Sequence, residues 1–335
     1  MNIRRLFFLS LSCRFRRGAG VLLLAAILLA LAGCGEGAGG DDDEKPVRVK
    51  NGMETFSEIS ASLGDKPVNT VDAPYELKLS GFDFSVNGMF AVVCDEFGDK
   101  YVALDLSACE GLSFVSGAGE GKNKIVSIIL PRTLESLPAP AGGGALGVFE
   151  GYAALKSVEI SGAVSIGDSA FKNCANLETI SFPPRIAGAV SGAFAGCPNL
   201  SFIVRAGRGN LSSPDGKSLV LNGNTLLAAA ESAVAGGLYE VPAGIRELAA
   251  DSLAGLRMTT VKIPDSVDKI GARAFAGCAS LTTVEIRAVT PPALILSGAA
   301  ASFPAGITAI HVPSGSLSNY RGAWTQFSTD KFYGF

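Results

Sequence analysis

A segment of about 22 residues recurs from residue 149 onward, and it limits the fold more than any other feature of the sequence. The clearest copies are FEGYAALKSVEI, FKNCANLETISF, FAGCPNLSFIV and FAGCASLTTVEI, which begin at Phe149, Phe171, Phe194 and Phe275. A degenerate copy, LAGLRMTTVKI, begins at Leu253, 22 residues before the last of these. A repeat of this length indicates a solenoid, because one unit cannot bury its apolar face alone and stacked units share a continuous core.

The shared pattern, A-F-x-x-C-x-x-L-x-x-I-x-I, predicts a turn followed by a short strand. Apolar residues alternate in the L-x-x-I-x-I half, as is typical of a strand with one buried face. We expect Pro131, Pro183, Pro264 and Pro313 to end such strands, since proline cannot donate to a ladder. The phenylalanine and the cysteine of the turn are expected to face the core.

The cysteines follow the repeat. Four of the seven precede a leucine as C-x-x-L, at Cys109, Cys174, Cys197 and Cys278, so each should face the core as a small apolar side chain. No C-x-x-C motif or nearby histidine supports a zinc site. With Cys94 they make five, an odd number, and we expect buried free thiols. Cys174 and Cys197, on adjacent coils, are the pair that could form a disulfide in an exported protein.

These residues resemble the BspA-type, or Treponema-type, leucine-rich repeat family over roughly residues 101–335. The segments YVALDLSACEGL (101–112), NKIVSIILP (123–131) and AIHVPSGSLSNYRGAW (309–324) extend the similarity beyond the repeats. The resemblance implies an α/β repeat solenoid, a right-handed superhelix with short parallel strands and short helical turns, capped at both ends. It also implies a cell-surface protein that binds protein partners. Two departures stand out: Leu253 and Leu256 replace the repeat phenylalanine and cysteine, and Arg205 falls where an inward isoleucine is expected.

The solenoid is expected over 101–313, with a hairpin insertion at about 213–230. Residues 51–100 read as an N-terminal α/β cap, because solenoid ends need caps. Residues 314–335 read as a C-terminal cap. The side chains that support the caps are a helical face of Phe56, Ile59 and Leu63, a strand with Tyr75, Leu77 and Leu79, a buried helix over 84–97, and Tyr320, Trp324 and Phe327.

The N-terminus is typical of an export signal. Residues 1–17 contain five arginines and no acid, and the apolar run 21–32 is shorter than the roughly 20 residues that span a bilayer. The run ends in Leu31-Ala32-Gly33-Cys34, which resembles the lipobox of bacterial lipoproteins. We therefore expect a lipoprotein signal peptide over 1–33, lipidation of Cys34 and a flexible acidic, glycine-rich tether over 34–50. The alternative is an ordinary signal peptide followed by an incidental cysteine.

The formal net charge limits the classes of partner that the protein is expected to bind. Removal of 1–33 takes five arginines and no acid, so the formal net charge changes from −3 to −8. A chain this acidic should repel nucleic acid and anionic headgroups, so we expect no nucleic-acid partner and membrane attachment through the lipid alone.

The residues offer little for catalysis. His311 is the single histidine, which disfavours Ser/His and Cys/His pairs. It lies between two apolar residues of an expected strand, so it should point outward. The stretch 116–123 resembles a phosphate-binding loop, but Ser116 and Asn123 replace the glycine and the Ser/Thr that such loops need. We expect no catalytic residues, no metal site, no cofactor and no enzymatic activity.

The candidate binding residues are those between the buried positions of the repeat strands. They are Ser157, Glu159, Thr179, Ser181, Thr260, Lys262, Thr283 and Glu285. Stacked strands would place them in rows, and an extended polar face suits a large partner because many modest contacts add up. The alternative is that Thr and Ser simply favour exposed strand positions.

Three functional hypotheses follow. The first is a lipid-anchored protein of the cell surface, in the outer membrane, that binds proteins such as host extracellular matrix or another bacterial surface protein. The second is a periplasm-facing scaffolding lipoprotein on the same fold. The third, a hydrolase that works without histidine, requires two carboxylates that converge in one pocket.

Overall fold

The computed structural model describes residues 47–48, 53–84, 89–110, 120–137, 146–162, 164–186, 190, 192–295 and 302–335. The chain divides into two compact units, Met1–Lys45 and Pro46–Phe335. The predicted signal peptide and Cys34 lie outside the described residues, and so does most of the predicted tether. Within its range, 34–50, the two described residues form strand β1.

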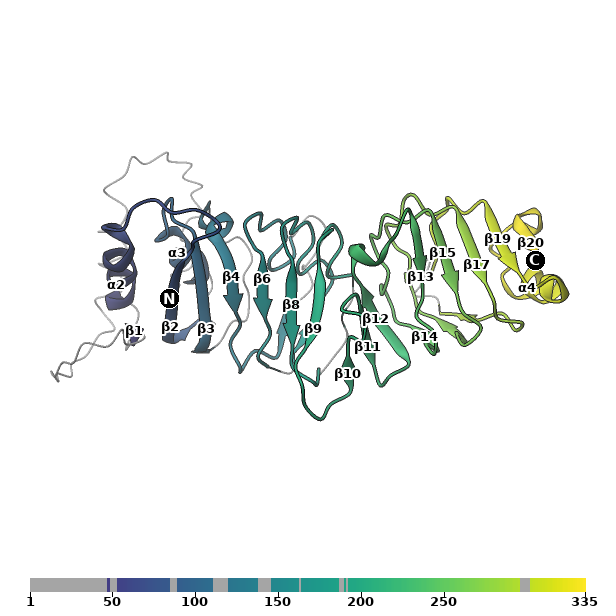
Figure 1. Ribbon diagram of the computed structural model, residues 1–335, viewed down its shortest axis with the longest axis horizontal. Helices are drawn as coiled ribbons and strands as arrows, with labels where there is room; N and C mark the ends of the chain where they lie inside the picture. Colours follow the sequence, from purple (N-terminus) through teal and green to yellow (C-terminus); the bar gives the residue numbers. More distant parts are fainter. Residues whose placement is uncertain are drawn as a thin grey trace, which may run out of the picture. The chain divides into compact units, whose positions relative to one another are not determined.

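Parallel strands one repeat apart build the second unit (Figure 1). The first sheet, sheet 1, has the order β1-β2-β3-β4-β6-β8-β9 among the described residues, and its neighbours all pair in parallel. Its strands are β1 (Val47–Arg48), β2 (Tyr75–Asp83), β3 (Val102–Glu110), β4 (Ile125–Ile129), β6 (Ser157–Glu159), β8 (Thr179–Phe182) and β9 (Ser201–Val204).

Sheet 2 continues the same kind of ladder in the C-terminal half, in the order β13-β15-β17-β19-β20, again with parallel pairing. Its strands are β13 (Leu238–Glu240), β15 (Thr260–Ile263), β17 (Thr283–Ile286), β19 (Ala309–Val312) and β20 (Phe332–Gly334). These two ladders confirm the predicted repeat solenoid with short parallel strands.

A second strand in most coils forms two further sheets. Sheet 3 runs β10-β11-β12-β14-β16-β18, and sheet 4 pairs β5 with β7. Their strands are β10 (Leu211–Ser212), β11 (Ser218–Leu221), β12 (Thr225–Ala229), β14 (Glu247–Leu248), β16 (Lys269–Ile270), β18 (Ala293–Leu294), β5 (Ser136–Leu137) and β7 (Ser165–Ile166).

The repeat phenylalanines and cysteines line the core as predicted. Phe149, Phe171 and Phe194 stack in sequence, with ring centroids 5.2 and 5.8 Å apart. All five described cysteines are buried and free, which confirms the expected free thiols. The thiols of Cys174 and Cys197 donate to the carbonyl of the phenylalanine that begins the preceding repeat, at 3.0 and 3.1 Å. A small side chain with a weak donor therefore fits this position better than another apolar residue.

The hairpin predicted near 213–230 exists, and it separates two cores. Strands β10, β11 and β12 pair antiparallel, and β12 then pairs in parallel with β14. Leu219 and Leu227 belong to the buried cluster of the N-terminal half, whereas Val220 and Leu226 belong to that of the C-terminal half. Both faces of the hairpin are therefore covered.

The N-terminal region extends sheet 1. Helix α2 (Met53–Gly64) buries Ile59 and Leu63, while the side chain of Phe56 is outside the described set. Within the range 84–97, where a helix is expected, the described residues contain α3 (Met89–Asp95), which ends two residues before Phe97. A 3-10 turn, η1 (Glu120–Lys124), precedes β4. Strand β3 is nine residues long and pairs along the nine residues of β2.

The C-terminal end closes the second core. Helix α4 (Leu317–Ala323) lies beside β20 and between the 3-10 turns η3 (Ser314–Ser316) and η4 (Thr329–Lys331), and a further turn, η2 (Glu231–Ala233), precedes β13. The Tyr320 hydroxyl donates to the Ala288 carbonyl at 2.7 Å, and the Trp324 indole donates to the Pro292 carbonyl at 3.0 Å. Both rings are buried and Phe327 is half-buried, so these residues pack as predicted. The predicted domain boundaries remain predictions.

Candidate functional site

The eight predicted binding residues occupy paired positions on the two ladders. In sheet 1, Ser157 lies opposite Thr179 and Glu159 lies opposite Ser181. In sheet 2, Thr260 lies opposite Thr283 and Lys262 lies opposite Glu285. All eight are half-buried, and the residues between them point into the core. The alternation of the repeat therefore produces rows of polar side chains on one face of each sheet.

The rows extend beyond the predicted residues. In sheet 1 the register continues the hydroxyl row to Ser127 on one side and to Ser201 on the other. In sheet 2 the charged row runs from Glu240 through Lys262 and Glu285 to His311 and Tyr333. Because β9 and β13 are not paired with each other among the described strands, the two sheets present two separate faces.

Most charges on these faces are paired. Lys262 donates to Glu240 at 2.9 Å, and this hydrogen bond and charge lower the pKa of the Glu240 carboxyl. Glu285 lies 3.6 Å from Arg287, and Lys78 lies 3.3 Å from Asp105. Since each pair is at least partly exposed, it contributes little to stability but fixes where charges stand on the face.

His311 takes an outward position in the charged row of sheet 2, as its place between two apolar residues predicts. Its ring stacks on Tyr333, with centroids 5.4 Å apart and planes at 29°. Tyr333, which is 47% exposed, was not among the predicted binding residues. The sequence pattern that could have predicted its outward position is the alternation of Phe332 and Tyr333. Two residues are too few to predict a strand without knowledge of the neighbouring coil.

Arg205 does not face the core. Strand β9 is paired so that Phe202 lies opposite Ile180 and Val204 lies opposite Phe182, which fills both inward positions. Arg205 therefore turns outward, where its guanidinium contacts Glu159 and donates to the Ile160 carbonyl at 2.6 Å. The repeat is one residue shorter here than its pattern suggests, and Ile203 is left 48% exposed on the face.

Two carboxylates converge on one cation at the boundary between the halves. Arg273 lies 2.8 Å from Asp251 and 3.4 Å from Asp168, which is 105 residues away in the sequence. Burial raises the pKa of Asp251, with the charge of Asp168 adding to the shift and Arg273 opposing it. The arginine bridges both carboxylates, so this is an ion bridge and not the free carboxylate pair that a hydrolase needs.

No group of three or more His, Cys, Asp or Glu side chains among the described residues is placed to hold a metal ion. The buried thiols are also held protonated: burial raises the pKa of Cys109, Cys174 and Cys197 to about 12 and that of Cys278 to about 11. These cysteines therefore serve packing at neutral pH.

The architecture defines a class, a parallel repeat solenoid with polar rows on its strands. Residues 145–206 and 239–293 match the family model of the BspA type leucine rich repeat region, in six copies. These two segments therefore form a BspA-type leucine-rich repeat region, which confirms the resemblance over the residues matched. The stretch between the two matched segments, 207–238, contains the hairpin.

Three solved structures are similar to the chain. A leucine-rich repeat protein from Eubacterium ventriosum ATCC 27560 is 14% identical, with a TM-score of 0.30 over 62% of this chain and 73% of that chain. A leucine rich cell surface protein from Faecalibacterium prausnitzii A2-165 is 16% identical, with a TM-score of 0.25 over 78% and 87%. The pneumococcal vaccine antigen PcpA is 15% identical, with a TM-score of 0.24 over 71% and 86%. Among curated proteins, none matches the chain.

Proposed function

We propose that the protein is a lipid-anchored, non-catalytic protein of the cell surface that binds protein partners through the polar rows of sheets 1 and 2. The observation that carries the proposal is the register of those rows, which brings outward side chains from successive repeats onto one face of each sheet. A rigid ladder holds these groups in place before binding, so little conformational entropy is lost when a partner docks.

The anchoring part of the proposal rests on the sequence around Cys34. Lipidation of that cysteine would hold the protein at a membrane, because acyl chains contribute about 0.8 kcal/mol for each buried CH₂ group. None of the helices in the described part of the chain is long and apolar enough to cross a bilayer. The family resemblance supports partners such as host extracellular matrix or another bacterial surface protein.

A matched pair of lysines tests the binding face. Lys262 in sheet 2 and Lys269 in sheet 3 belong to the same coil, and each is half-buried and paired with a glutamate of the preceding coil, at 2.9 and 2.7 Å. We expect Lys262→Glu to weaken binding of a partner captured from extracellular matrix or bacterial surface extracts, and Lys269→Glu to leave it unchanged. Equal losses in both variants would contradict the assignment of the face.

Two further experiments test location. Labelling with a fatty-acid analogue should mark the wild-type protein and fail in Cys34→Ala; a variant that still takes up label would refute the lipid site. Protease added to intact cells should cut a protein of the cell surface. Protection until the cells are permeabilised would favour the periplasm-facing scaffold instead.

A further inference from the structure

Three exposed arginines occupy the same corner of the coils that form sheet 1. Arg132 follows β4, Arg185 follows β8 and Arg208 follows β9, and we call these three residues the arginine ridge. Because β4, β6, β8 and β9 are successive neighbours and neighbouring strands lie about 4.8 Å apart, Arg185 and Arg208 are about 5 Å apart along the stack and Arg132 is about 10 Å farther on. The intervening coil has Gly162 at this corner, against the backbone of Arg132.

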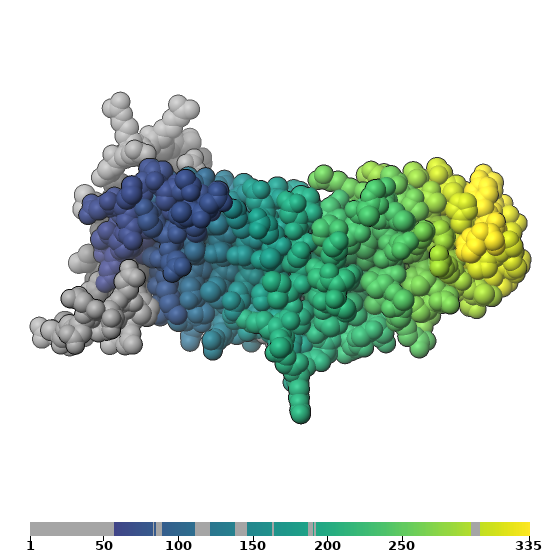
Figure 2. Space-filling model, in the orientation of Figure 1, coloured from purple at the N-terminus to yellow at the C-terminus, as the bar shows by residue number. Residues whose placement is uncertain are grey.

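The backbone holds the ridge in place. The Arg185 side chain donates from Nε to the Arg208 carbonyl at 3.1 Å, and the Leu211 amide donates to the Pro184 carbonyl at 3.1 Å. A Cβ atom at Gly209 would overlap that same carbonyl, so glycine is required for the turn to lie this close. The segment between β9 and β10 is therefore tied down at both sides while it projects at the lower edge of the molecule (Figures 1 and 2).

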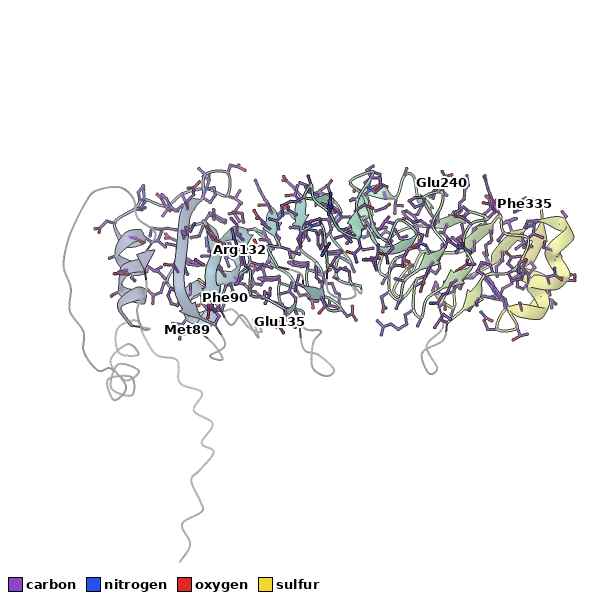
Figure 3. All side chains as sticks on the ribbon, turned by 90° about the horizontal axis from the view of Figure 1, so that it is seen from below. Met89, Phe90, Arg132, Glu135, Glu240 and Phe335 are labelled. Atoms are coloured by element: carbon purple, nitrogen blue, oxygen red, sulfur yellow. The ribbon has the colours of Figure 1, made fainter. Side chains whose placement is uncertain are left out.

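The charge of the ridge is not compensated. None of its three arginines has a carboxylate partner among the described residues, whereas Arg246, which directly precedes β14 in the C-terminal half, is paired with Asp268 at 2.8 Å. Arg205, next to the ridge in sequence, is already paired with Glu159. Glu135 is the acid that follows Arg132 in the chain, and the two are labelled at separate positions in Figure 3.

We propose that the arginine ridge binds an acidic segment of a protein partner, whose carboxylates accept hydrogen bonds from the guanidinium groups of Arg185 and Arg208. This inference rests on the proposed protein-binding function and adds a second surface to it, with the chemistry that the partner must offer. The planar fork of a guanidinium matches a carboxylate in two parallel hydrogen bonds. A line of cations one strand apart also suits an extended chain.

The net charge favours a short acidic segment over a dense polyanion. The chain without residues 1–33 has a formal charge of −8, and such a charge repels other anions across a Debye length of about 8 Å at physiological salt. A sulfated polysaccharide carries its charge along its whole length and would meet this repulsion beyond the ridge. A protein segment with a few carboxylates in an otherwise neutral surface would not.

Fluorescence anisotropy with a labelled peptide that carries a few Asp and Glu residues in an otherwise neutral sequence, added to the full chain at low salt, tests the proposal. We expect binding that weakens as salt rises and that falls about tenfold in the Arg185→Ala/Arg208→Ala double variant. Arg257→Ala is the matched control, because Arg257 is an exposed arginine of the C-terminal half whose guanidinium forms no ion pair among the described residues. Its contact with a carboxylate, to Glu231 at 3.1 Å, comes from the backbone amide, which the substitution keeps, so the variant should leave the affinity unchanged. The single variant Arg208→Ala removes one charge but keeps the hydrogen bond from Arg185 to the backbone carbonyl of residue 208. It therefore distinguishes the effect of losing charge from the effect of disturbing the turn.

Unchanged affinity in the double variant, or an equal loss in Arg257→Ala, would overturn the inference. Tighter, ridge-dependent binding of a heparin fragment than of the peptide would overturn it too, in favour of a polyanionic polysaccharide. These failures are distinct from failure of the proposed function, because the comparison of Lys262→Glu with Lys269→Glu tests the sheet faces without touching the ridge.

Discussion

Replacement of Phe171 by alanine removes the middle ring of a buried stack. The Phe171 side chain is 0% exposed and lies between Phe149 and Phe194, with interplanar angles of 11° and 14°. Truncation of a buried phenylalanine to alanine costs about 3–5 kcal/mol, and the loss of two ring contacts places this site near the upper end, at about 5 kcal/mol. Phe171→Leu should cost only about 1–2 kcal/mol, because Leu253 is fully buried at the same repeat position.

Phe171→Ala should destabilise the first core more than the second, and this difference can be measured. Trp324 is the single tryptophan, and it lies in the second core, beyond the hairpin that separates the two buried clusters. In urea we expect the far-UV circular dichroism of Phe171→Ala to fall at lower denaturant than in the wild type. The midpoint of the Trp324 fluorescence should move less than half as far.

Two results would refute this reasoning. Equal shifts of both signals would show that the two cores unfold as one cooperative unit despite the hairpin between them. A loss of less than about 2 kcal/mol for Phe171→Ala, or no difference between the alanine and leucine variants, would show that the stack of rings does not carry the stability assigned to it.

Two other outcomes are expected. Arg273→Ala should lower the free energy of unfolding by about 1 kcal/mol at low salt and by less at high salt, because the ion bridge to Asp168 and Asp251 is partly exposed. Denaturation is measured at two salt concentrations, and no loss of stability at low salt would contradict the role of the bridge. The free energy of unfolding should also fall as pH rises above about 9, by up to about 1.4 kcal/mol per pH unit for each repeat cysteine. The reason is that the thiol ionises in this range in the unfolded chain, whereas in the folded chain, where the pKa of Cys174 and Cys197 is about 12, it stays protonated. Urea titrations at pH 8, 9 and 10 measure this, and a flat profile would contradict the burial of the thiols.

The repeat made most of the core predictable. Phe171 and Cys174 recur at fixed spacing, and because a solenoid gives every repeat the same environment, their burial followed from the pattern alone. The hairpin was predictable for a different reason: Asn222-Gly223 between two apolar runs is a strong local signal for a tight turn.

The register and the division of the face could not be predicted. Phe202, Ile203 and Val204 are all apolar, so periodicity cannot tell which of them face inward, and only the pairing with β8 decides it. The burial of Leu219 and Val220 in two different cores depends on what covers each side of the hairpin, which no local pattern records. The placement of outward side chains in rows was therefore predicted within each sheet, while their separation into two faces was not; their role in binding stays a prediction.

The hairpin lies between the polar faces of sheets 1 and 2. The turns before and after the hairpin contact each other directly. Gly255 lies so close to Ala195 that an added Cβ would stand 2.5 Å from the alanine Cβ, and Arg273 forms an ion pair with Asp168. The hairpin thus separates the ladders of sheets 1 and 2, whereas the turns of the coils on either side of it stay in contact. Insertion of such a hairpin between two coils would divide one continuous polar row into two while every residue of both rows stays the same, so insertion alone is a route by which a repeat protein can alter its recognition surfaces.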